Sequence, residues 1–248
     1  MLDLALLLST AAFILVGSAV GVRLLLLAAR TRELPDLIVG LALFDLSAIA
    51  YPLILVANLG GLPLSDAKLA LTLAIAALAV GLAGVFAFNQ RVFRSDERWA
   101  AVFVWGCVGL LGYGAIAGGA FLREASSRAA FTAPESPAIW VEVAGVLVYA
   151  WTALEGFNAW GQARKRMRLG LADPLVANRF LLWGAMGVAS LVSFAPSLAI
   201  TLSGGDGSTS ALARLTTACG GLAAAICLLL AFSPPAKYRA WITRRVAA

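Results

Sequence analysis

The chain has 248 residues, of which 61% are hydrophobic and 13% are charged, and its formal net charge is +6. This composition excludes a soluble protein, because no soluble core could bury so much apolar sequence, and too little chain remains for a second domain. It indicates an integral membrane protein whose first partner is the lipid bilayer. We therefore read the positive charge as that of membrane loops that favour anionic lipid, and we expect no nucleic-acid binding.

Seven apolar stretches, each long enough to cross a bilayer, follow one another along the chain. A hydrocarbon core of about 30 Å needs roughly 20 apolar residues in a helix. The stretches lie at 3–28, 37–58, 67–88, 100–122, 138–160, 175–202 and 209–232. We predict an all-α fold, a bundle of seven transmembrane helices that forms one domain over 1–248 and ends in a short basic juxtamembrane tail at 234–248. The first stretch lacks the basic start of a signal peptide and is predicted to be a retained span.

Basic residues gather on alternate loops, which predicts the orientation of the chain in the membrane. Thirteen lie in the first, third and fifth connections and the C-terminal tail: Arg30, Arg32, Arg91, Arg94, Arg98, Arg164, Lys165, Arg166, Arg168, Lys237, Arg239, Arg244 and Arg245. The other connections hold three: Lys68, Arg123 and Arg128. Short loops rich in Lys and Arg stay in the cytoplasm during insertion. We predict a multi-pass protein of the bacterial plasma (inner) membrane, with the N-terminus outside and the C-terminus in the cytoplasm.

Two residue types are informative because they are scarce. The chain has no histidine, so we expect no His-ligated haem and no metal site built on His. Its three lysines, Lys68, Lys165 and Lys237, lie in predicted loops or at helix ends. The seventh span therefore offers no amine for a Schiff base, and we expect no covalent retinal. The sequence predicts no cofactor and no metal.

Ionisable residues inside the predicted spans are the first candidates for function. A charge at mid-bilayer costs roughly 2.5–3.5 kcal/mol on insertion scales, and it persists where it is paired or useful. Asp45 and Glu155 lie about two turns from the cytoplasmic side. Glu142 and Arg214 lie at similar depth near the outer side, and we predict that they contact each other or share a ligand. An inner polar layer is predicted from Asp45, Glu155, Asn158, Asn178 and Arg179. Fixing helix registry is the alternative role of such charges.

Helical spacing adds further residues to the candidate ligand-binding or polar network. Glu142 and Tyr149 are seven residues apart and share a helix face, whereas Glu155 is rotated away from them. Trp183 and Ser190 form a similar ladder on the next helix. Pro52 and Pro196 are expected to kink their helices. The candidate set is Asp45, Glu142, Tyr149, Glu155, Trp183, Ser190 and Arg214.

An internal repeat is suggested by matching residues in the first and last thirds of the chain. The shift that superposes Pro52 on Pro196 also superposes Gly60-Gly61 on Gly204-Gly205 and Leu71-Thr72 on Leu215-Thr216. Such a repeat gives a 3+1+3 arrangement with the fourth helix as linker, as in small-solute transporters with parallel repeats. Chance agreement between two sequences rich in Leu, Ala and Gly is the alternative.

The seventh stretch ends in Phe232-Ser233-Pro234-Pro235, and a basic, aromatic run follows as far as Trp241. A double proline stops a helix, and the mixed run after it suits a segment that lies along the inner headgroups. These residues resemble the end of bacterial seven-helix membrane sensor domains, in which a Phe-x-Pro-Pro stop leads into a cytoplasmic signalling domain. The resemblance implies a sensor. Because this sequence stops at Ala248 without such a domain, we expect its output to need a protein partner on the cytoplasmic face.

No cluster of a nucleophile and base, of metal-binding carboxylates or of a phosphate loop is recognisable, so we predict that the protein is not an enzyme. The sequence favours a receptor-like or sensor-like bundle that binds a small or lipophilic ligand, of unknown identity, between its helices. A small-solute transporter of 3+1+3 construction and an accessory subunit of a membrane complex are the alternatives. Sensing predicts a pocket closed toward the cytoplasm, transport predicts a polar path from both sides, and an accessory role predicts a tightly filled bundle.

Overall fold

The computed structural model describes the chain except for residues 1, 59–60, 128–129, 131–132, 206–209 and 248. All regular structure in the described residues is helical, and seven spans are long and apolar enough to cross a membrane. The prediction of an all-α bundle with seven such helices is confirmed. The helices are α1 (Leu2–Thr31), α2 (Leu34–Phe44), η1 (Asp45–Ala50), α3 (Tyr51–Asn58), α4 (Leu64–Phe93), α5 (Arg98–Glu124), α6 (Ile139–Met167), α7 (Pro174–Leu202), α8 (Ala211–Phe232) and α9 (Ala236–Ala247).

Several helices continue past the apolar stretches that predicted them. The stretch at 67–88 becomes α4, which ends at Phe93, and the stretch at 138–160 becomes α6, which ends at Met167. Hydropathy marks where the chain leaves the hydrocarbon, but Gln, Lys and Arg are good helix formers and continue the hydrogen-bonded ladder. The basic residues therefore stand on helix ends as well as in loops.

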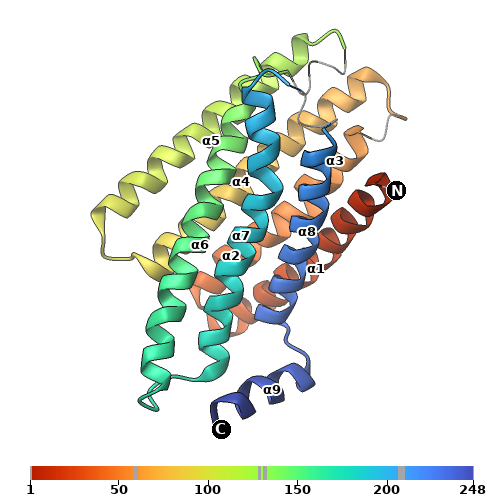
Figure 1. The fold of residues 1–248 in the computed structure, drawn as a ribbon. Coiled ribbons are helices and arrows are strands. Elements are labelled where there is room, and N and C mark those ends of the chain that lie inside the picture. The colour runs from red at the N-terminus through yellow and green to blue at the C-terminus, as the bar shows by residue number, and fades with distance from the viewer. Residues whose placement is uncertain (1, 59–60, 128–129, 131–132, 206–209, 248) are drawn as a thin grey trace.

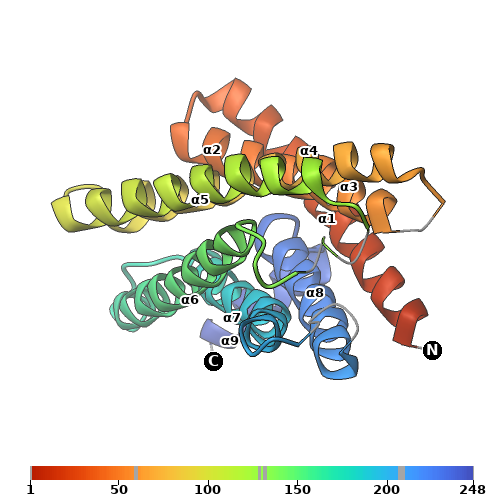
Figure 2. The same ribbon diagram turned by 90° about the horizontal axis from the view of Figure 1, so that it is seen from above.

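The helices follow one another around the bundle in chain order. Each span packs against the next, α1 packs against α8, and α4 also packs against α6. Seen from above, α1, α2, α4 and α5 form one side of the bundle and α6, α7 and α8 the other (Figure 2). The last residues of α1, α4, α6 and α8 lie on one side of the bundle, which we call the basic end. It lies toward the bottom of Figure 1, where α9 is attached.

Small residues allow α6 and α7 to pack backbone against backbone. A Cβ added to Gly156 of α6 would lie 2.5 Å from the backbone nitrogen of Gly184 on α7. One turn further along, a Cβ on Gly187 would lie 2.6 Å from the backbone nitrogen of Ala153. Close approach through small residues is a common way to hold helices together in a bilayer, where lipid removes most of the hydrophobic driving force. The interface positions Glu155 and Trp183 on neighbouring helices.

The second span changes its winding in the middle of the bilayer. α2 passes into the π-helical segment η1 at Asp45, and α3 begins immediately before Pro52. Proline has no N–H and clashes with the carbonyl one turn earlier, and the wider π turn gives that carbonyl room. The other predicted kink site, Pro196, lies inside α7 without such a segment. The two prolines matched by the proposed repeat thus differ in local structure, and the repeat itself stays a prediction.

The tail forms a helix of its own. α8 ends at Phe232, the double proline follows, and α9 begins at Ala236. The hydroxyl of Tyr238 on α9 donates a hydrogen bond to Oδ1 of Asn178 on α7, with an oxygen-to-oxygen distance of 3.2 Å. The predicted stop at the prolines is confirmed, and the tail is held against the basic end of the bundle.

Candidate functional site

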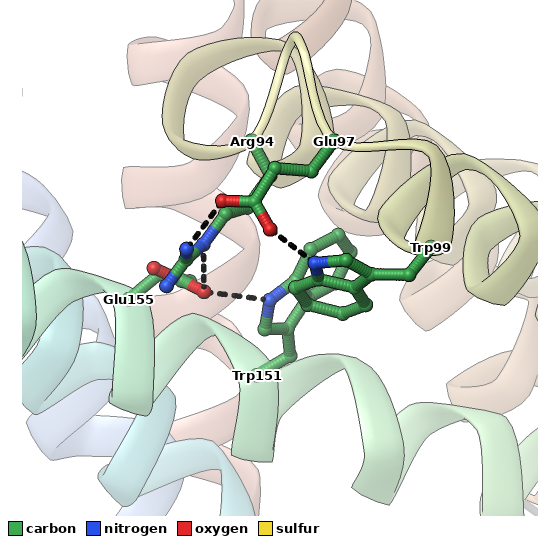
Figure 3. Close-up of polar contacts among 5 residues, drawn as sticks. All are labelled: Arg94, Glu97, Trp99, Trp151 and Glu155. Carbon is green, nitrogen blue, oxygen red and sulfur yellow. Dashed lines mark hydrogen bonds and ion pairs between the residues drawn. The ribbon is translucent and has the colours of Figure 1, made fainter.

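A buried carboxylate on α6 is paired with an arginine just beyond the end of α4. Nε of Arg94 lies 2.8 Å from Oε1 of Glu155. The Glu155 side chain is 8% exposed, whereas that of Arg94 is 31% exposed. The pair ties the connection between α4 and α5 to a position near the middle of α6 (Figure 3). Glu155 was a predicted site residue, but its partner comes from a loop and not from the predicted inner layer.

Glu97 extends this pair into a small network. Its Oε1 accepts a hydrogen bond of 2.7 Å from Nη1 of Arg94, and its Oε2 accepts one from the indole N–H of Trp99. Hydrogen bonds to Glu155 and Glu97 raise the pKa of Arg94 above its ordinary value, and the bonds from Arg94 and Trp99 lower the pKa of Glu97. Arg94 and Glu97 are therefore both charged at neutral pH.

Aromatic side chains enclose the network on the bundle side. The indole N–H of Trp151 donates to Oε1 of Glu155 at 3.1 Å. The Trp151 ring contacts Phe86 of α4 and both Trp99 and Phe103 of α5, with ring centroids 5.3 to 6.5 Å apart. Because this apolar wall keeps water from Glu155, the ion pair is stronger than one at an open surface, and the cost of leaving the carboxylate unpaired is higher.

A second buried polar cluster joins α4, α6 and α7. Nδ2 of Asn89 donates to the hydroxyl of Thr152 at 2.7 Å, and its Oδ1 accepts from the indole N–H of Trp183 at 3.2 Å. Asn89 and Thr152 have no exposed surface. Thr152 and Glu155 are three residues apart on α6 and therefore lie on neighbouring parts of one face. The two clusters therefore lie about one helical turn apart along α6.

Asp45 is half-buried, and its Oδ2 faces α4 and not Glu155. It opens the π-helical segment, and a Cβ added to Gly81 would lie 3.1 Å from its Oδ2. That oxygen is buried and has no hydrogen-bond partner in the part of the chain that the structure describes. A π turn within a helix frequently marks a functional position. Asp45 therefore stays a candidate, apart from the Arg94 network.

The predicted outer pair is not formed directly. Glu142 lies in the first turn of α6 and Arg214 in the first turn of α8. No ion pair joins these two side chains in the part of the chain that the structure describes. The direct contact was the wrong prediction because α7 stands between α6 and α8, packing against both. A ligand shared by the two residues stays a prediction.

Of the remaining predicted residues, Tyr149 lies at the interface of α6 and α7, and Ser190 is buried on α7. The ring of Tyr149 stacks on Phe194 with centroids 5.6 Å apart, and Ser190 donates to the sulfur of Met186 on its own helix at 3.6 Å. The predicted inner polar layer does not form as one unit. Asn158 is exposed to the surroundings of the bundle, while Asn178 and Arg179 lie together at a cavity near α9.

An open groove runs between α4 and α5 close to the Arg94 network. Its volume is about 380 Å³, and it is lined by Ala83, Gly84, Ala87, Gln90, Ala101, Val104, Trp105 and Val108. This size falls within the usual range for small-molecule sites, roughly 300–1,000 Å³, and the lining is mostly apolar with one amide. Gln90 stands one turn before Arg94, so an occupant of the groove would lie beside the α4–α5 connection.

Sequence reasoning did not find Arg94, Glu97, Asn89 or Thr152. Sequence analysis used Arg94 only for orientation, because hydropathy does not show that the turn after α4 folds back over α6. The useful signal in the sequence was the depth of Glu155 in its span. A carboxylate at that depth needs a cation, and Arg94 follows a span that ends on the same side of the membrane. In comparisons with known proteins, no protein-family model, no curated protein and no solved structure matches this chain.

Proposed function

We propose that this membrane protein is a sensor or receptor that binds a small lipophilic ligand between its helices and acts through a protein partner. One observation supports the proposal: the groove and the Arg94 network both lie on the helical hairpin formed by α4 and α5. Glu155 holds the connection of this hairpin to α6, and a ligand in the groove would change how α4 and α5 lie. Release or tightening of the ion pair would then alter the surface presented at the basic end.

Coupling between the groove and the ion pair is the first prediction of this proposal. A panel of lipophilic small molecules is screened for compounds that raise the thermal stability of the purified protein. Spin labels at Asp96→Cys and Lys165→Cys, in a background with Cys107, Cys219 and Cys227 replaced by alanine, report the distance between the α4–α5 loop and α6. We expect a bound compound to shift this distance, and we expect Glu155→Gln to shift it without any compound.

The matched control separates groove binding from general partitioning. Ala87→Phe fills the groove and should abolish the ligand-induced shift, whereas Val80→Phe, at an exposed position on α4 outside the groove, should leave it intact. A shift that survives Ala87→Phe contradicts the proposed site. If the same compound instead undergoes counterflow in proteoliposomes, the protein is a transporter. If no compound binds and the hairpin never moves, an accessory role is the better explanation.

Orientation is a second prediction, and it rests on the thirteen to three split of basic residues between the two sets of loops and tails. We propose that the basic end faces the cytoplasm of a bacterial cell and that the N-terminus is outside. A reporter enzyme active only in the cytoplasm should be active when fused after Ala248, and one active only in the periplasm should be inactive there. The opposite pattern would place the Arg94 network outside the cell and remove the proposed cytoplasmic partner.

A further inference from the structure

A second cavity lies at the basic end, away from the groove and from the Arg94 network. Its volume is about 250 Å³, and it is bounded by α1, α7, the end of α8 and the start of α9. Three arginines from three different helices line it, together with one amide and a few apolar residues. The lining residues are Arg23, Leu175, Asn178, Arg179, Leu230, Ala231, Pro234 and Arg239.

Hydrogen bonds hold the walls of this cavity in place. Nη1 of Arg23 donates to the hydroxyl of Ser233 at 2.7 Å, which ties α1 to the residue after α8. Tyr238 donates to the side-chain Oδ1 of Asn178, so the NH₂ group of that amide keeps its donors for another partner. The cavity is therefore built by side chains far apart in sequence, and α9 completes it.

The charge of the cavity is positive. Guanidinium groups stay protonated at all physiological pH values, and their planar fork matches the oxygens of a phosphate. Asp36 at the start of α2 acts electrostatically on Arg179, so one carboxylate partly offsets three positive charges. An anion bound among the arginines would remove their mutual repulsion.

From the size, lining and charge we propose that this cavity binds a phosphate group. Its volume is below the range typical of drug-sized ligands, as a headgroup site would be. Basic pockets between transmembrane helices are suited to anionic lipid headgroups. Leu175, Leu230 and Ala231 supply apolar surface beside the arginines, which favours the phosphate of an anionic lipid over the free ion. The inference does not depend on the proposed sensing function.

Titration of the purified full-length protein tests the site. Phosphatidylglycerol, phosphatidylcholine, oleate and inorganic phosphate are added separately in detergent, at a salt concentration that screens surface charges, and the apparent affinity is read from thermal stabilisation. We expect phosphatidylglycerol to stabilise the protein. Arg179→Gln and Arg239→Gln should each weaken its binding about tenfold, as expected for a lost charge-assisted hydrogen bond.

Arg244→Gln is the matched control, because Arg244 lies on α9 as Arg239 does but does not line the cavity. It should leave the affinity unchanged, and Arg179→Lys should retain part of it while keeping the fold. Stabilisation by inorganic phosphate alone would support the site with the free ion as its source. Equal losses in the Arg244 and Arg239 variants, binding of oleate or phosphatidylcholine as tight as that of phosphatidylglycerol, or no effect of phosphatidylglycerol and inorganic phosphate would overturn the proposal.

Discussion

Replacement of Arg94 by methionine is expected to destabilise the protein by about 3–5 kcal/mol. The change leaves Glu155, whose side chain is 8% exposed, as a buried charge with the indole N–H of Trp151 as its remaining hydrogen-bond donor among the described residues. Removing one partner of a buried ion pair costs this much because the other charge stays desolvated and unpaired. Reversible thermal or chemical unfolding in detergent measures the loss.

The converse replacement, Glu155→Met, should cost less. Arg94 is 31% exposed and keeps its bond to Glu97, so it can turn toward water. The double variant should be more stable than Arg94→Met alone, and a double-mutant cycle gives the coupling energy. Arg91→Met is the matched control, since Arg91 is exposed on the last turn of α4, just before Arg94. If the losses of unfolding free energy in the two single variants simply add in the double variant, Arg94 and Glu155 do not stabilise each other, and the ion pair is contradicted.

The fold follows from the sequence because its signals are local. Each span is long and apolar, and the pair Pro234-Pro235 follows the end of α8. The length of a bilayer fixes how many residues a span needs, so no tertiary information is required. The π-helical turn at Asp45 was not predicted, although Pro52 pointed to an irregularity in that helix.

The candidate site follows only in part, because pairing depends on how helices are arranged. Glu155 was recognised from its depth, and Trp183 from its helix face, and both are buried in polar clusters. Of their partners, Asn89 lies on α4 and Arg94 directly follows that helix, and no feature of the sequence states that α4 packs against α6. The same limit explains the error for Glu142 and Arg214, whose equal depth says nothing about α7 between them.

Replacement of Gly156 by alanine is expected to lower stability by about 1–3 kcal/mol, although alanine is the better helix former. A Cβ at this position would lie 2.5 Å from the backbone nitrogen of Gly184 and 2.6 Å from its Cα. Backbone atoms cannot rotate away as a side chain can, so α6 and α7 must separate, and the cost is that of an overpacked core. The separation would also displace Glu155, the neighbouring residue on α6, from Arg94.

Gly161 on the same helix provides the control for this effect. A Cβ added there would meet no atom within 4 Å, so Gly161→Ala should leave stability unchanged or raise it by up to about 1 kcal/mol through helix propensity alone. The difference in unfolding free energy between the two variants, measured under the same conditions, separates the cost of the clash between α6 and α7 from the helix propensity of alanine. If Gly156→Ala were as stable as Gly161→Ala, α6 and α7 would not be in backbone contact, and the placement of Glu155 beside the α4–α5 hairpin would lose its structural support.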